Sequence, residues 1–204
     1  MTGSENSWDR RYAQPDYLFG LEPNAFLVRQ SAHLKPGSKA LAVADGEGRN
    51  GVWLAQQGLS VLSIDNSPVG QAKARRLAES RGVTMAFEEA NLETWSWPEA
   101  AFDLVAAIFI QFAPPALRAR IFDGLQAALK PGGVLLLQGY RPEQIAYGTG
   151  GPAAPQNLYT EPMLRAAFAG MDILELRSHD SPIHEGKGHD GVSALIDLVA
   201  RKHA

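Results

Sequence analysis

The chain of 204 residues contains no cysteine. This excludes disulfide bonds, thiolate nucleophiles and cysteine metal sites, and it is typical of a reducing compartment. Long apolar runs are also absent, since the longest, Leu104 to Ile110, falls far short of the ~20 residues that span a bilayer. Residues 1–12 are polar and lack the apolar segment of an export signal. We therefore expect a soluble cytoplasmic protein without a membrane partner.

An excess of positive charge is missing too. The 19 Lys and Arg residues are outnumbered by 22 Asp and Glu, which gives a net charge of -3. Proteins that bind nucleic acid usually show the opposite balance, so we expect a small-molecule substrate and no nucleic acid. An apolar share of 45% in a chain of this length predicts a single domain with a sizeable core. Both a monomer and a homodimer are compatible with this composition.

The most informative stretch runs from Lys39 to Gly51 (KALAVADGEGRNG). Its short apolar run is followed by Gly46 and Gly48 and then by helix-forming residues, which predicts a strand, a tight loop and a helix start where a ligand can lie against bare backbone. A second apolar run, Ser60 to Asp65, ends in a carboxylate. It lies about 20 residues further on, the spacing at which a βαβ unit presents an acid to a ribose diol. Together these features predict a nucleoside site.

Residues 46–51 also match the dinucleotide pattern G-x-G-x-x-G. Asp45 and Glu47 argue against a dinucleotide, because a carboxylate ~4 Å from a phosphate costs roughly 4 kcal/mol at an effective dielectric of 20. S-adenosyl-L-methionine has an adenosine, an ammonium and a sulfonium but no phosphate, so an acidic loop favours it. An NAD(P)-dependent oxidoreductase and a noncatalytic S-adenosylmethionine-binding regulatory module stay open as alternatives.

Strand and helix patterns alternate along the chain, which predicts an α/β fold with a doubly wound parallel sheet. After the first strand we expect strands over Ser60–Asp65, Thr84–Glu88, Leu104–Ile110 and Val134–Gln138, and helices over Asn50–Gln57, Pro68–Ser80, Pro115–Leu129 and Glu161–Phe168. Ile173–Arg177 and Val192–Arg201 are expected to be consecutive strands joined by a hairpin-like segment. The charged side chains of the helix after Pro68, Lys73 among them, are expected on its solvated face.

The region from Lys39 to Gly51 resembles motif I of the class I S-adenosylmethionine-dependent methyltransferases. Its Gly48-Arg49-Asn50 ending resembles the branch of tellurite-resistance-type and small orphan bacterial methyltransferases. Other stretches resemble the family in chain order: Trp8-Asp9-Arg10, Phe19-Gly20 and Glu22-Pro23-Asn24 in the N-terminal cap, Asn91-Leu92 beside adenine, Leu129-Lys130-Pro131-Gly132-Gly133 before the fifth strand, and Glu185-Gly186, His189 and Gly191 in the C-terminal hairpin.

This resemblance implies a Rossmann-like, mostly parallel seven-stranded sheet with an antiparallel C-terminal edge. It divides the chain into a cap segment, residues 1–37, and a methyltransferase domain, residues 38–204. The sequence departs from the family at two positions, with Ala42 in place of an acid and Ala44 in place of the first glycine. We therefore expect Asp45 or Glu47 to take over the hold on the amino group of the cofactor.

Ligands of an open α/β sheet bind at the carboxyl ends of the strands. We expect the cofactor there, on Asp45, Gly46, Glu47, Gly48, Arg49, Asn50, Asp65, Asn66, Asn91, Leu92, Ile108 and Phe109. The two acceptor oxygens of Asp65 match the two ribose hydroxyls, Asn91 and Leu92 suit adenine, and Ile108 and Phe109 suit the methionine end. The product would be S-adenosyl-L-homocysteine.

On the substrate side we expect Tyr12, Tyr17, Tyr140, His184 and His189, with the N-terminal aromatic residues closing over the ligand. Methyl transfer is an in-line displacement that depends on alignment. A general base is needed only for a protonated acceptor, and we assign none; a thiol or another soft nucleophile is the expected acceptor. His179, His184 and His189 recur at intervals of five, which fits neither one helix face nor one strand face, so we expect no metal.

Overall fold

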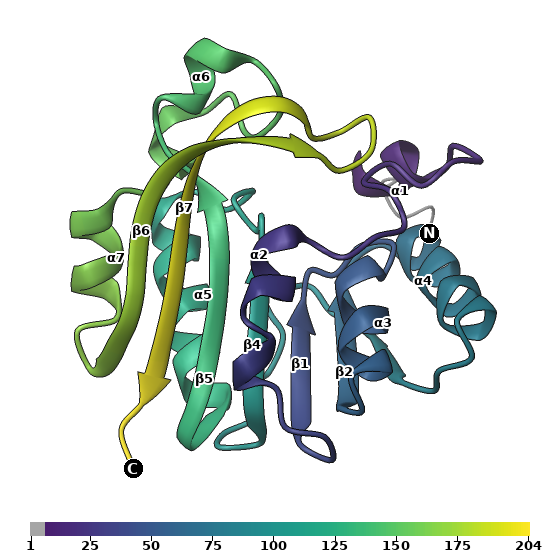
Figure 1. Ribbon diagram of the computed structural model, residues 1–204, viewed down its shortest axis with the longest axis horizontal. Helices are drawn as coiled ribbons and strands as arrows, with labels where there is room; N and C mark the ends of the chain where they lie inside the picture. The colour runs from purple at the N-terminus through teal and green to yellow at the C-terminus, as the bar shows by residue number, and fades with distance from the viewer. Residues whose placement is uncertain (1–6) are drawn as a thin grey trace.

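The computed structural model describes residues 7–204, in which seven strands form one sheet in the order β3-β2-β1-β4-β5-β7-β6 (Figure 1). The strands are β1 (Lys39–Val43), β2 (Ser60–Asp65), β3 (Ala86–Glu89), β4 (Phe102–Ile108), β5 (Leu129–Tyr140), β6 (Met171–His184) and β7 (Asp190–Lys202). The first five strands pair in parallel, and β7 lies antiparallel between β5 and β6. This confirms the predicted doubly wound sheet with an antiparallel C-terminal edge.

Helices cover both faces of the sheet (Figure 1). They are α1 (Ser7–Tyr12), α2 (Ala25–Arg29), η1 (Ser31–His33), α3 (Arg49–Gln56), α4 (Pro68–Ser80), α5 (Pro115–Ala128), α6 (Gln144–Tyr147), η2 (Pro155–Asn157) and α7 (Glu161–Ala167). Local sequence explains where α4 begins. The side chain of Ser67 accepts a hydrogen bond from the Gly70 amide, and Pro68 occupies the first turn, where its missing N–H costs nothing.

The central strands bury side chains on both faces, which explains their nearly unbroken apolar sequences. On β5, Leu135 and Leu137 pack in the cluster that includes α5 and α7. Leu136, between them, points the other way and packs in the cluster that includes Phe26 and Leu27 of α2. This alternation follows from the two-residue period of a strand. The sheet is therefore the shared wall of two cores.

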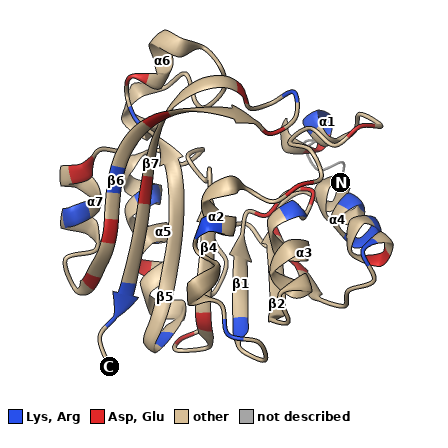
Figure 2. Ribbon diagram, viewed as in Figure 1, with Lys and Arg blue, Asp and Glu red and all other residues tan. Residues whose placement is uncertain are grey.

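The predicted cap, residues 1–37, begins outside the described residues, and its described part lies against the rest of the molecule. Phe26 and Leu27 are fully buried, and α1 contacts α4. Helix α1 has no counterpart among the sequence expectations. Figure 2 shows a group of basic side chains on α4 and charges of both signs spread over the other elements. In the described part of the chain, no helix has the length and apolarity needed to cross a bilayer.

Strand β6 is far longer than predicted, because it pairs antiparallel with β7 from Met171↔Lys202 to His184↔Asp190, with one register shift between Ile173 and Glu175. Most of its residues are partly or fully exposed on the sheet edge, so its sequence carries little apolar signal. Figure 1 shows the β6–β7 hairpin curving over the carboxyl ends of the parallel strands toward α1. The sequence thus located the strand but not the reach of the hairpin.

Strand β4 ends at Ile108, two residues before the predicted end. The next residue, Phe109, has a φ of 56° in the left-handed region, and this turns the chain out of the sheet. The apolar pattern continues through Ile110 because Phe109 is partly buried and Ile110 is buried after the strand has ended. Apolarity here reports burial rather than strand conformation.

Gly48 offers a direct test of how tightly the loop after β1 is packed. Its φ is 88°, and a Cβ added there would lie 2.5 Å from the Cβ of Ala74 on α4. We expect Gly48→Ala to lower the free energy of unfolding by about 2 to 4 kcal/mol, from left-handed strain and overpacking together. The control Gly82→Ala also has a positive φ but meets no atom within 4 Å, so it should lose only about 1 kcal/mol. Equal losses in urea unfolding would contradict this packing.

Candidate active site

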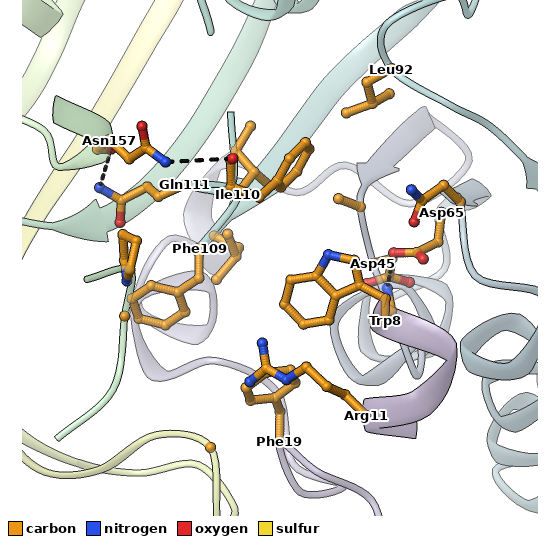
Figure 3. Close-up of a pocket in the computed structure, with 18 of the residues that line it drawn as sticks. Trp8, Arg11, Phe19, Asp45, Asp65, Leu92, Phe109, Ile110, Gln111 and Asn157 are labelled. Atoms are coloured by element: carbon orange, nitrogen blue, oxygen red, sulfur yellow. Dashed lines mark hydrogen bonds between the residues drawn. The ribbon is translucent and has the colours of Figure 1, made fainter. Parts of the chain in front are cut away.

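A cavity of about 690 Å³ lies at the carboxyl ends of β1, β2, β4 and β5, between α1 and the β6–β7 hairpin. Its size is that of pockets for drug-sized ligands. Figure 3 shows Trp8 and Arg11 of α1 reaching into the space between Phe109 on one side and Asp65 on the other. The cavity therefore has two ends, each with its own chemistry.

At one end, Asp65 supports the glycine loop. Its two carboxylate oxygens accept hydrogen bonds from the amides of Gly46, at 2.9 Å, and Ser67, at 2.8 Å. Burial raises the pKa of Asp65 in spite of these bonds. Gly46 has a φ of 57°, and a Cβ there would lie 2.5 Å from the hydroxyl of Tyr12. Gly46 and Asp65 both line the cavity, so the loop backbone and an acceptor carboxylate lie side by side there.

Asp45 lies beside this loop. One carboxylate oxygen accepts from the Gly51 amide at 3.1 Å and the other from the Ser63 hydroxyl at 2.8 Å. Burial raises the pKa of Asp45 to about 7, although these two bonds act in the opposite direction. The carboxyl group therefore changes charge near neutral pH. A cationic ligand would favour its ionised form.

Glu47 does not line the cavity, contrary to the expectation that it holds the cofactor. Its carboxylate pairs with Lys73 at 2.6 Å and accepts from the Leu18 amide at 2.7 Å. Lys73 is 4% exposed, so its predicted place on the solvated face of α4 is wrong. An ammonium buried this deeply needs a carboxylate partner, and Glu47 supplies it. The charge of Glu47 is thereby neutralised away from the ligand.

Three more of the predicted site residues lie outside the cavity. Gly48 packs on α4, as described above, and Tyr17 donates its hydroxyl to the carbonyl of Lys73 at 3.0 Å. The side chain of His184 is 76% exposed and pairs with Asp190 at 2.6 Å. Successive residues of a strand point to opposite faces. Ile183 takes the buried face, so His184 lies on the surface.

The remaining predicted residues are brought together around the cavity: Tyr12, Asp45, Gly46, Arg49, Asn50, Asp65, Asn66, Asn91, Leu92, Ile108, Phe109, Tyr140 and His189. Asn91 also shapes its own turn, since its side-chain oxygen accepts from the Glu93 amide at 3.0 Å. Leu92 is buried next to it. Their roles toward a ligand stay predictions.

The other end of the cavity is an aromatic wall, which we define as Phe19, Phe109, Tyr140 and His189. Phe109 stacks on Tyr140 with ring centroids 4.6 Å apart. The imidazole of His189 lies 4.5 Å from both Phe19 and Phe109. These rings come from the cap, from the turn after β4, from the end of β5 and from the hairpin, so only the folded chain assembles them.

Sequence reasoning missed several lining residues, among them Arg11, Gln111 and Asn157. Arg11 places its guanidinium 4.4 Å from the ring centroid of Trp8. Gln111 donates to the carbonyls of Tyr140 and Asn157, the latter drawn in Figure 3. The only available signal was the position of Gln111 directly after an apolar strand. For Arg11 and Asn157 the sequence offers none.

A buried ion pair joins the two ends. Arg49, at the start of α3, lies 2.5 Å from Glu185 of the hairpin, and both side chains are less than a tenth exposed. Asn24 donates to Glu185 at 3.0 Å and to Gln138 of β5 at 2.7 Å. Burial acts to raise the pKa of Glu185, but His189 and Arg49 together outweigh it, so this pKa is lowered. The carboxylate is therefore ionised at neutral pH.

Comparison with known proteins agrees with this architecture. Residues 40–133 match the family described as a methyltransferase domain. An uncharacterized protein of Mycobacterium tuberculosis is 31% identical over 129 residues, which cover 61% of this chain and 46% of that protein. An uncharacterized methyltransferase of Synechocystis is 32% identical over 112 residues, 54% of this chain and 51% of the relative. The chain thus spans about half the length of these curated relatives.

Solved structures share the fold across nearly the whole chain. The N-methyltransferase NodS of Bradyrhizobium japonicum, in complex with S-adenosylhomocysteine, has a TM-score of 0.73 at 17% identity and covers 96% of both chains. TehB of Haemophilus influenzae has a TM-score of 0.72 at 16% identity and covers 96% of this chain and 65% of TehB. The domain match and the shared fold together support a class I S-adenosylmethionine-dependent methyltransferase domain. At these sequence identities, the two structures are evidence for the fold alone.

The residues that line the cavity fit S-adenosylmethionine. Gly46 lines the cavity without a side chain, and the carboxylate of Asp65 offers acceptors beside it. Asp45 supplies an acid for an ammonium group, and Leu92 and Ile108 supply apolar surface. The donor set therefore suits a nucleoside joined to a cationic amino acid.

Glu185→Gln should show how much the buried pair stabilises the fold. It leaves Arg49 buried without a counter-charge, so we expect a loss of about 3 kcal/mol in the free energy of unfolding at pH 7. Because folding lowers the pKa of Glu185 from 4.5, this contribution is present above that value and is lost as the pH falls through the folded pKa. Glu22→Gln, which breaks the exposed pair with Arg81, should cost less than about 1 kcal/mol. Equal losses would show that burial of the Arg49 pair is unimportant.

Proposed function

We propose that this protein transfers a methyl group from S-adenosyl-L-methionine to a small-molecule acceptor. The single observation that carries the proposal is the cavity at the carboxyl ends of the strands, with the Asp65-supported glycine loop at one end and the aromatic wall at the other. The family match supports the same reaction type. When bound, the cofactor supplies an activated methyl group on a positively charged sulfur.

In this proposal the adenosine lies at the Asp65 end. Asp65 accepts from the ribose hydroxyls, while Asn91 and Leu92 bind the adenine edge and face. Asn66 follows Asp65 and lines the same end. The methionine part then extends along Asp45, Arg49 and Asn50 toward Ile108 and Phe109, and the reacting methyl group faces the aromatic wall.

Charge supports the cationic cofactor over a dinucleotide through Asp45 alone. Glu47 is paired with Lys73 and no longer counts toward repulsion of a pyrophosphate. Asp45 remains in the cavity, and its ionised form is favoured by an ammonium and disfavoured by a phosphate. The oxidoreductase alternative therefore predicts that Asp45→Asn improves binding of NADH, and the methyltransferase proposal predicts no such binding.

The acceptor is proposed to be a thiol or another soft nucleophile. The aromatic wall gives a polarizable, largely apolar surface, on which sulfur packs favourably. The place of the chain in the tellurite-resistance-type branch is part of this proposal and rests on Gly48-Arg49-Asn50. We expect transfer to small thiols rather than to a nucleic acid, in keeping with the net charge of -3.

Calorimetry with S-adenosylmethionine and S-adenosylhomocysteine tests the cofactor site. Both should bind, and Asp65→Asn should weaken S-adenosylhomocysteine about 10- to 100-fold, since an amide offers one acceptor oxygen instead of two. Asp103→Asn is the matched control, because Asp103 pairs with Lys130 at the opposite end of β4 and should leave the affinity unchanged. Failure of both ligands to bind would refute the proposal. Binding without methyl transfer to any acceptor would instead favour the regulatory module.

Asp45 gives a pH dependence of cofactor binding. Its carboxyl is mostly protonated at pH 6, because burial raises its pKa to about 7. If the cofactor's ammonium binds beside it, the carboxyl must lose its proton, so affinity for S-adenosylhomocysteine should fall about tenfold from pH 8 to pH 6. Calorimetry at pH 6 in buffers of different ionisation enthalpy should show proton release. Asp45→Asn should abolish both effects, and a flat profile in the wild type would contradict this role.

A further inference from the structure

The aromatic wall contains two buried polar atoms without a hydrogen-bond partner among the described residues, the hydroxyl of Tyr140 and Nδ1 of His189. Tyr140 is 1% exposed and His189 is 7% exposed. Unsatisfied groups inside a protein are costly and call for an explanation. Both residues line the end of the cavity opposite Asp65, where an acceptor would lie. The aromatic wall therefore carries two polar groups, the Tyr140 hydroxyl and the His189 imidazole.

His189 is held in a fixed orientation. Its ring lies between Phe19 and Phe109, with the edge of Tyr140 at 5.6 Å. The backbone before it is equally confined, because a Cβ at Gly188 would overlap the ring of Phe19. Nδ1 is enclosed on the side of Glu185, 3.8 Å from its Oε2. Nε2 is the ring nitrogen left to meet a ligand in the cavity.

The charges around His189 keep the imidazole neutral. Burial lowers its pKa, Arg49 and Arg11 act in the same direction, and Glu185 opposes them. Glu185 itself is ionised, since its own pKa is lowered. When this neutral imidazole accepts a proton, the ionised carboxylate beside it stabilises the imidazolium that results.

We propose that His189 is the general base of the reaction and that the acceptor carries a protonated nucleophile, a thiol or a phenol. This inference rests on the proposed function. The proton of the acceptor X–H group moves to Nε2 of His189, and the electron pair left on X forms the bond to the methyl carbon. The pair of the broken carbon–sulfur bond stays on sulfur, and the imidazolium later releases its proton to water. Glu185 is a positioning residue that acts through His189.

Two thiols of different acidity test whether His189 acts as a general base or only lines the aromatic wall. At pH 7.5, 2-mercaptoethanol is mostly protonated, whereas 4-nitrothiophenol is ionised and needs no base. We expect His189→Gln to lower kcat/KM about 10²- to 10⁴-fold for the first thiol and less than about tenfold for the second. His184→Gln is the control, since His184 lies in the same hairpin, exposed and outside the cavity; it should change neither value.

A measurement independent of turnover is the titration of ¹³C-labelled histidine by NMR in the complex with S-adenosylhomocysteine. The signal that is missing in His189→Gln should titrate below the ordinary histidine range. Glu185→Gln should lower this pKa further, because it removes the charge that favours the imidazolium. Melting curves and S-adenosylhomocysteine affinity show whether each variant is folded. If Glu185→Gln does not fold, the titration of His189 in the wild type still tests the proposal.

The outcomes separate the two proposals. Equal losses for both thiols, an imidazole that is charged at neutral pH, or no transfer to any protonated acceptor by a protein that binds S-adenosylmethionine would each overturn the role of His189. A protein that binds neither S-adenosylmethionine nor S-adenosylhomocysteine would overturn the proposed function itself.

Discussion

The structure depends on the buried ion pair between Arg49 and Glu185, which joins the start of α3 to a hairpin 136 residues later in the chain. Desolvation makes such a pair costly unless its remaining hydrogen-bonding groups are satisfied. Here Asn24 donates to the carboxylate, and the guanidinium donates to the carbonyl of Glu22 at 3.3 Å. The cap, the glycine loop and the hairpin thus meet at one charge pair. The hairpin is polar and half exposed, so apolar burial alone gives it little reason to lie over the sheet.

The same charges decide the chemistry of the cavity. Arg49 keeps Glu185 ionised, and Glu185 faces the ring nitrogen of His189. On the other side of the loop, Lys73 forms a buried ion pair with Glu47 and neutralises its charge. An acidic loop in the sequence therefore becomes, in the folded protein, one titratable acid in the cavity, Asp45. Of the two acids of the loop, only this carboxyl group is left to favour a cation over a diphosphate, which is a weaker basis than the sequence indicated.

The sequence predicts the features that depend on residues close together in the chain, and it misses those that depend on partners far apart in it. The start of α4 is set by Ser67 and Pro68, which act on the first turn of the helix. The central strands follow from apolar runs that any packed sheet would bury. Asp65 was within reach because a βαβ unit fixes its spacing from Gly46. The length of β6 was not, because pairing with β7 sets it and its own side chains remain half exposed. Lys73 was misjudged for a similar reason: its partner lies 26 residues away, where no helical period reports it.

Phe109 shows how the fold aims a side chain that local rules oppose. A bulky residue in the left-handed region costs about 1–2 kcal/mol, yet its φ is 56° and its amide donates to the Gln138 carbonyl at 2.8 Å. That bond holds the turn at the end of β4, and stacking on Tyr140 together with an edge-to-face contact with His189 compensates for the strain. A glycine would relax the backbone but remove the ring on which the imidazole rests. The strained backbone at Phe109 therefore places its ring in the aromatic wall, directly after the last residue of β4.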